Sequence, residues 1–244
     1  ELVSFQIENQ EYIHQKGNKG WPNSDDEMFP IIGPTSKNNF KVHTKNGDAI
    51  QDQHGFLREL DYTLISNDEN SANFIKKYKK NTLVTNRKFS KKSAEEYLFW
   101  PFDFTFKKKF TLKNDVLKIE FIIDSEKGMP FMLGYHPAFL LSDSGKETLV
   151  SKDEKITLDA IYKAGSNAFP VLNSDKIRLQ HIDKKDLEIS TKGFDNFMLW
   201  TEVNNMLCIE PITQYNSYTD QKFSEKNMRL SKEKNSFSVT IKTV

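Results

Sequence analysis

The stretch FTFKKKFTLKNDVLKIEFIID, residues 104–124, alternates apolar side chains with charged and polar ones. The phenylalanines of its first half, such as Phe106, lie on one side of an extended chain, and the second half repeats the period of two through Phe121. Asn114 and Asp115 interrupt the alternation with residue types that favour tight turns. The stretch therefore predicts an antiparallel β-hairpin with one apolar face.

Further segments outside this hairpin also have strand character. They are LEIST at 187–191, NFMLWTEV at 196–203, MLCIEPI at 206–212 and FSVTIKTV at 237–244. Turn-forming Gly, Asn, Asp and Ser residues separate them, and no alternation of strands with helices is present. This pattern predicts an all-β protein, either a β-sandwich or a related double-sheet fold.

One short helix is expected. Ser93 is followed three residues later by Glu96, which is the spacing of a capping box, and Pro101 would end the helix soon afterwards. We expect the lysine-rich stretches at 76–80 and 107–109 to be solvated strand faces.

The composition bounds the class of protein. A chain of 244 residues fits one large domain or two small ones, and a single domain over residues 1–244 is the better prediction. Hydrophobic residues make up 37% and the formal net charge is +1, which supports a globular core and disfavours nucleic-acid binding. The only cysteine is Cys208, and no apolar run approaches the roughly 18 residues of a membrane span. We expect a cytoplasmic protein without membrane contact.

The common cofactor and metal motifs are absent from the sequence. No HExxH or CxxC spacing occurs, so no metal site is expected. The glycine patterns that bind dinucleotides and phosphates are missing, as is the GxSxG nucleophile motif, and no cofactor is expected. Polar residues in apolar contexts remain as the candidates for chemistry.

Two histidines are candidates. His136 stands in the apolar run MLGYHPAFLL, where Pro137 cannot donate to a sheet ladder, so the strand ends or lies at an edge there and frees the ring to face a cavity. A buried, hydrogen-bonded histidine is the alternative. His54 precedes Gly55, which permits close backbone approach, and Arg58 follows; a simple turn residue is the alternative for His54.

Two carboxylates complete the set. Glu210 lies between Ile209 and Pro211, and loss of hydration there is expected to raise its pKa and suit it to act as a general base. Its alternative is a solvent-facing residue at a strand end. Asp195 begins an apolar strand and is either a ligand for hydroxyl groups or a turn former. Together these residues have the parts for acid–base chemistry on a polyhydroxylated molecule.

Several of these motifs occur together in one family. FPIIG at 29–33, QHGFLR at 53–58, WPFDF at 100–104, GYHPAF at 134–139 and CIEP at 208–211 resemble, in order and approximate spacing, the aldose 1-epimerases, and most closely the LacX-type branch of galactose mutarotase-like proteins. The resemblance covers essentially the whole chain. It implies a β-supersandwich of antiparallel sheets with a sugar site in a cleft across one concave face.

The resemblance also implies roles for residues. His136 would be the general acid, Glu210 the general base and His54 a second histidine on the sugar, while Asp195 and Arg58 would bind sugar hydroxyls. Pro34 stands where many relatives have a sugar-binding arginine, and Arg58 is a possible substitute. The chain is similar to the family from an early internal segment onward, so a leading strand is expected to be missing before residue 1.

The implied activity is interconversion of the α and β anomers of an aldohexose such as galactose or glucose. A histidinium and a carboxylate, each favouring the charge of the other, would open the ring with no cofactor, in a monomer or homodimer. Two alternatives stay open. One is a sugar-binding or regulatory module without turnover, and the other is action on a phosphorylated hexose, against which the scattered arginines count.

Overall fold

The computed structural model describes residues 1–142, 144–216 and 223–244. In these residues the larger sheet has nine strands, all paired antiparallel. Their order is β16 (Glu154–Thr157), β15 (Thr148–Ser151), β18 (Lys176–Gln180), β19 (Leu187–Lys192), β23 (Lys234–Thr243), β11 (Val116–Ser125), β10 (Phe104–Lys113), β7 (Ser71–Tyr78) and β6 (Thr63–Asn67).

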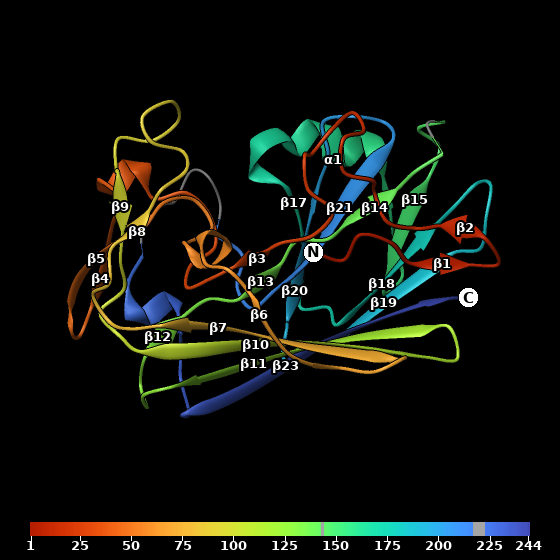
Figure 1. The fold of residues 1–244 in the computed structure, drawn as a ribbon. Coiled ribbons are helices and arrows are strands. Elements are labelled where there is room, and N and C mark those ends of the chain that lie inside the picture. Colours follow the sequence, from red (N-terminus) through yellow and green to blue (C-terminus); the bar gives the residue numbers. More distant parts are fainter. Residues whose placement is uncertain (143, 217–222) are drawn as a thin grey trace.

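A second antiparallel sheet carries the residues of most interest. Its order is β17 (Phe169–Leu172), β20 (Asn196–Trp200), β21 (Met206–Ile212), β13 (Gly134–Tyr135) and β3 (Glu27–Met28), and β14 (Ala138–Leu140) also pairs with β21. The long strands β7, β10, β11 and β23 lie along the bottom of the molecule, and the second sheet rises above them (Figure 1). The expected double-sheet, nearly all-β architecture is confirmed.

Short elements connect and flank the two sheets. The small ladders are β1 (Gln6–Ile7) with β2 (Gln10–Glu11), β4 (Lys41–Thr44) with β5 (Gly47–Ile50), β8 (Val84–Thr85) with β9 (Tyr97–Leu98), and β12 (Pro130–Phe131) with β22 (Arg229–Leu230). The helices are α1 (Leu158–Ala164) and the 3₁₀ turns η1 (Ser36–Asn38), η2 (Leu57–Glu59), η3 (Gly165–Asn167) and η4 (Glu225–Asn227). The ladder β4–β5 lies at the left and α1 at the top of Figure 1.

The predicted hairpin is β10 and β11. Phe106 pairs with Ile123, and the turn residues Asn114 and Asp115 both have positive φ angles, as a two-residue hairpin turn with the twist of its strands requires. The apolar face is buried: Phe121 packs on Tyr135 of β13, with ring centroids 5.2 Å apart. The other expected strands coincide with β19, β20, β21 and β23, although β20 ends at Trp200 instead of continuing to residue 203.

The predicted helix at Ser93 is wrong. The Ser93 hydroxyl accepts a hydrogen bond from the Glu95 amide, which closes a local turn, and the chain then enters β9. Serine makes such turns as readily as helix caps, and no apolar helical repeat follows to favour the helix. The α-helix in the described part of the chain is α1, capped by Thr157.

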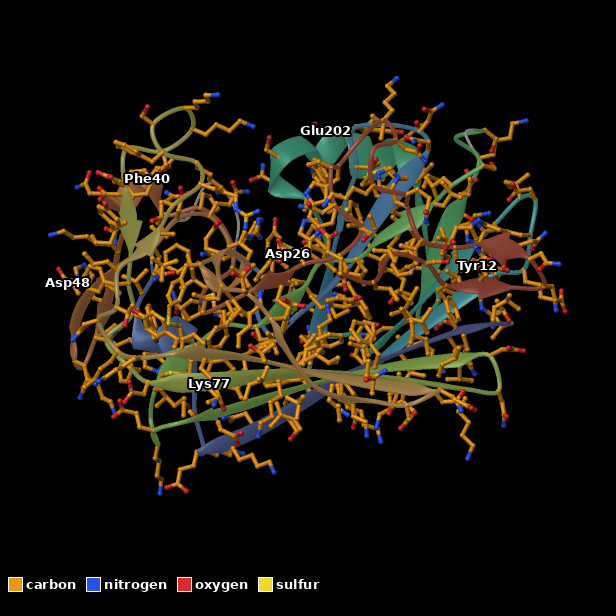
Figure 2. All side chains as sticks on the ribbon, in the orientation of Figure 1. Tyr12, Asp26, Phe40, Asp48, Lys77 and Glu202 are labelled. Carbon is orange, nitrogen blue, oxygen red and sulfur yellow. The ribbon has the colours of Figure 1, made fainter. Side chains whose placement is uncertain are left out.

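The prediction of fully solvated lysine stretches is also wrong for Lys76 and Lys108. Lys108 continues the inward face of β10, is only 2% exposed, and places its ammonium group 2.6 Å from both Asp25 and Glu27. Burial disfavours the charge, but the two carboxylates outweigh it and raise the pKa of Lys108 above its usual range. By contrast Lys77, labelled at the bottom of Figure 2, is exposed. The period of two therefore overrides the charge of the run.

Candidate functional site

A cavity of about 410 Å³ brings the candidate residues of distant segments together. Its walls come from the loop that contains His54, from η2, from the link between β13 and β14, and from β20, β21 and η3. The lining includes Trp21, Pro34, His54, Arg58, Lys88, Lys92, His136, Met198, Trp200, Glu202 and Glu210. The cavity brings together four of the five predicted site residues, namely His136, Glu210, His54 and Arg58.

His136 lies where the strand is interrupted between β13 and β14, as Pro137 led us to expect. The backbone of Asp26 holds it on both sides, because the His136 amide donates to the Asp26 carbonyl at 2.8 Å and the Asp26 amide donates back at 3.1 Å. The ring is 7% exposed and stacks on the indole of Trp21, with centroids 4.2 Å apart. Among the described residues, Nδ1 of His136 has no hydrogen-bond partner.

Glu210 lies on β21 opposite Met198 of β20. It is 2% exposed, so the alternative of a solvent-facing strand end does not hold. Its Oε1 lies 3.5 Å from Nε2 of His136. Burial raises the pKa of Glu210 to about 8, and the charge of Arg58 opposes this only in part. The expected upward shift is therefore present.

The protonation state of the free pair differs from the expected histidinium and carboxylate. Burial, with a smaller effect of Arg58, lowers the pKa of His136 to about 3. With the pKa of Glu210 at about 8, the pair at neutral pH holds one proton, and that proton resides on Glu210. Desolvation penalises both charges, so the pair of neutral His136 and protonated Glu210 is more stable than the ion pair.

His54 is fixed by its backbone. It has a φ of 68°, and Gly55 follows with a φ of 71°. A Cβ on Gly55 would lie 2.1 Å from the Phe29 carbonyl oxygen, so only glycine allows this close approach. The Gly33 amide donates to Nδ1 of His54 at 3.1 Å, which places the hydrogen of the neutral ring on Nε2. Burial holds the pKa of His54 well below its usual value, so the ring is a neutral hydrogen-bond donor.

Arg58 projects from η2 into the same cavity. Its Nε lies 3.5 Å from Asp26 Oδ2, a distance and geometry that make no hydrogen bond, and within the described chain neither Nε nor Nη2 has a hydrogen-bond partner. Pro34 lines the cavity as well. Arg58 is thus a mostly buried cation whose Nε and Nη2 donors have no partner among the described residues, and it shares the cavity with Pro34.

Asp195 was predicted to be a sugar ligand, but the structure does not place it in the cavity lining. Its side chain is 65% exposed and forms an ion pair with Arg229. The Asp195 carbonyl accepts a hydrogen bond from Ser174, and β20 begins one residue later. The turn-forming alternative describes this residue.

Several residues in or next to the cavity lining were not predicted from the sequence. Trp21 reaches His136 from a segment 115 residues earlier, and no local pattern marks it. Lys88 and Lys92 lie in a loop whose charges alone indicate nothing about a site. Cys208 precedes Glu210 by two residues on β21, so the strand period places both side chains on one face.

Together with His136, Cys208 and Glu210 form a set of possible metal ligands. Ligand atoms of His136, Cys208 and Glu210 all lie within 4.8 Å of one another, and all three residues are buried.

In the described ranges, no helix is long and apolar enough to cross a membrane.

Comparisons with known proteins show the family and the fold of the chain. The family model described as aldose 1-epimerase matches residues 2–239. The LacX protein of Lactococcus lactis is 22% identical over 95% of this chain and 89% of its own length. A galactose mutarotase related enzyme from Lactobacillus acidophilus has a TM-score of 0.76 at 21% identity, covering 97% of this chain and 88% of that one. A galactose mutarotase-like protein from Lactobacillus casei gives 0.72 at 16%, covering 97% and 90%. The fold is galactose mutarotase-like, as expected.

Proposed function

Because this chain belongs to the aldose 1-epimerase family, we propose that its cavity interconverts the α and β anomers of an aldohexose such as galactose or glucose. The observation that carries this proposal is the pair formed by His136 and Glu210, whose Nε2 and Oε1 atoms lie 3.5 Å apart in a buried part of the cavity. An acid and a base at this spacing can reach the ring oxygen and the adjacent C1 hydroxyl of one sugar.

Ring opening moves two protons. His136, as imidazolium, gives a proton to the ring oxygen, and the carboxylate of Glu210 takes the proton of the C1 hydroxyl. The bond between C1 and the ring oxygen breaks while the C1 carbonyl forms. Rotation about the C1–C2 bond presents the other carbonyl face, and both transfers reverse on closure. Each proton transfer to a positioned group contributes roughly 10²–10⁴-fold to the rate.

The shifted pKa values favour this sequence of steps. A proton that moves from Glu210 to His136 creates the reactive ion pair, and ring opening returns the pair to the neutral form that burial favours. The low pKa of His136 makes its imidazolium a strong acid, and the high pKa of Glu210 makes its carboxylate a strong base. Burial therefore makes the ion pair scarce in the free site and drives both proton transfers once it has formed.

Neighbouring groups can orient the sugar. Among the described residues, Nε and Nη2 of Arg58 have no hydrogen-bond partner and can donate to sugar oxygens. Nε2 of His54 lies 3.3 Å from the side-chain amide of Gln53, and it can donate to a sugar oxygen in place of that contact. The partly exposed indole of Trp200 offers an apolar surface for the C–H face of a pyranose. We assign Arg58 and His54 to substrate binding and orientation.

Polarimetry on freshly dissolved α-galactose and α-glucose tests the activity. The wild-type protein is expected to bring the optical rotation to equilibrium faster than buffer alone. Calorimetry on the same sugars is the companion measurement. Sugar affinity without any acceleration of mutarotation would contradict the proposal and favour a binding module on the same fold.

A phosphorylated hexose is a second candidate substrate, because the scattered basic residues of the sequence meet at the cavity. Lys88, Lys92 and Arg58 all line it. Lys88 lies 3.4 Å from Asp52, whereas Lys92 is exposed at the wall. Comparing kcat/KM for galactose and glucose with kcat/KM for their 6-phosphates distinguishes the candidates. If the phosphate is bound here, Lys92→Ala lowers kcat/KM only for the 6-phosphates, and the exposed Lys80→Ala control changes neither.

A further inference from the structure

Beside the proposed acid and base, His136 and Glu210, lies a third metal-ligand side chain, Cys208, that sugar chemistry does not require. Cys208 is fully buried and is paired across the sheet with Ala138 of β14 and Trp200 of β20. Its sulfur, a carboxylate oxygen of Glu210 and a ring nitrogen of His136 lie within 4.8 Å of one another. Cys208 does not line the cavity, but the other two residues do, so an ion among them would have one side open to the cavity.

We propose that His136, Cys208 and Glu210 form a binding site for Zn²⁺ or a similar borderline-soft divalent cation, and that the bound ion blocks proton transfer in the cavity. Only the second half of this proposal rests on the proposed function. Nitrogen, sulfur and oxygen ligands of these types are those that Zn²⁺ takes in proteins, three from the chain and a fourth from water where the site is open.

The geometry needs only a small adjustment. Zinc lies about 2.0–2.3 Å from such ligands, so in a tetrahedral arrangement the ligand atoms are about 3.3–3.7 Å apart. Atoms within 4.8 Å of one another reach that spacing by moving about 1 Å or less, within the range of side-chain rotation. Oxygen-preferring cations such as Mg²⁺ have no comparable set here, because they demand several oxygen ligands.

The polar groups of the site have free capacity for a ligand. Nε2 of His136 lies 3.5 Å from the Glu210 carboxyl, and in the part of the chain that the structure describes no group donates a hydrogen bond to that carboxyl. Zn²⁺ would replace the protons of Glu210 and Cys208, and the two resulting anions cancel its charge. A neutral assembly avoids the penalty of a buried net charge.

Bound zinc and turnover exclude each other. Glu210 cannot accept the C1 hydroxyl proton while its oxygen binds the metal, and His136 cannot donate a proton from a metal-bound nitrogen. The ion would also occupy the space next to C1. We therefore expect Zn²⁺ to inhibit competitively with the sugar.

Cobalt spectroscopy tests the site directly, without any need for activity. Co²⁺ added to the wild-type protein is expected to give a sulfur-to-cobalt charge-transfer band, which Zn²⁺ displaces and Mg²⁺ does not. Cys208→Ala should abolish the band and weaken Zn²⁺ binding by at least about tenfold. Met206→Leu is the matched control, because Met206 packs beside Cys208 and its loss leaves the three ligands intact.

The outcomes separate the two proposals. Absence of a sulfur-to-cobalt band in wild type, or Zn²⁺ affinity and inhibition that are unchanged in Cys208→Ala, would overturn the metal site. Cys208→Ser serves if the alanine variant does not fold, and its loss of the charge-transfer band carries the same conclusion. A cobalt band in a protein that shows no mutarotation even with a chelator present would overturn the proposed function and the inhibition, and leave the metal site standing.

Discussion

Asp26 holds His136 through two reciprocal backbone hydrogen bonds, of 2.8 and 3.1 Å, while its side chain faces Arg58. Asp26 lies near the centre of the view in Figure 2 and directly precedes β3 of the second sheet. Its neighbours Asp25 and Glu27 both contact Lys108. One short segment thus joins the buried ion cluster, the cavity cation and the backbone of the proposed acid.

Asp26→Asn separates the side-chain role from the backbone role. Asparagine keeps the backbone bonds to His136 and removes the carboxylate that restrains Arg58. We expect KM for the sugar to rise severalfold, as for loss of roughly 1 kcal/mol of ion-pair interaction, while kcat changes less. Steady-state polarimetry measures both. A severalfold fall in kcat with an unchanged KM would contradict the assignment of Arg58 to substrate binding.

The pH dependence follows from the two shifted pKa values. The pair holds one proton between about pH 3, the pKa of His136, and about pH 8, the pKa of Glu210. We expect kcat/KM to be flat from about pH 5 to 7 and to fall as Glu210 of the free protein ionises near pH 8. An ordinary histidine acid would instead lose activity from about pH 6.5 upward. A basic limb at that lower pH would contradict the proposed protonation state.

Glu210 also links folding to pH. Its pKa is raised from 4.5 to about 8 on folding, so the folded state binds the proton more tightly and stability falls as pH rises between these values. Glu210→Gln cannot ionise. Relative to wild type we expect its free energy of unfolding to gain up to about 1.4 kcal/mol per pH unit between pH 6.5 and 8, where an unfolded His136 is mostly neutral.

Denaturant titrations at several pH values measure this difference. Glu188→Gln is the control, because ion pairs with Lys176 and Lys242 lower the pKa of Glu188 and leave it ionised throughout this range. A constant difference between Glu210→Gln and wild type from pH 6.5 to 8 would show that Glu210 is not held protonated in the folded protein.

Lys108→Met tests the buried ion cluster of Lys108, Asp25 and Glu27. The substitution keeps most of the length and apolar stem of the side chain but leaves Asp25 and Glu27 buried without their common cation. We expect a loss of about 3–5 kcal/mol in unfolding free energy. Lys107→Met, which removes a half-exposed pair with Asp124, should lose less than about 1 kcal/mol. Equal losses for the two variants would count against a stabilising cluster.

Sequence patterns predicted the parts of the structure that depend on local alternation. The hairpin of β10 and β11 followed from a period of two, and the enclosed position of Glu210 in β21 followed from its apolar neighbours. The same period, applied to Lys108, predicts an inward side chain, but the charge of the run favoured solvent. Its burial depends on Asp25 and Glu27, more than 80 residues away in the chain.

The remaining site residues depend on tertiary contacts. His136, Glu210, His54 and Arg58 were grouped by chemistry and by resemblance to the family, and the structure brings them to one cavity. Asp195 directly precedes a strand, a position at which turn-forming residues are common. Its ion pair with Arg229 depends on the fold and could not be predicted from the sequence. Trp21 stacks on His136 from a distant segment, and no sequence pattern relates these two segments.

The most direct test of the acid–base pair is the mutarotation rate of Glu210→Gln beside wild type, with Glu188→Gln as the matched control. Glutamine keeps the shape of the side chain but cannot accept the C1 hydroxyl proton. We predict that kcat for α-galactose or α-glucose falls by roughly 10²–10⁴-fold in Glu210→Gln and stays near wild type in Glu188→Gln. Equilibration of the anomers by folded Glu210→Gln as fast as by wild type would contradict the central claim.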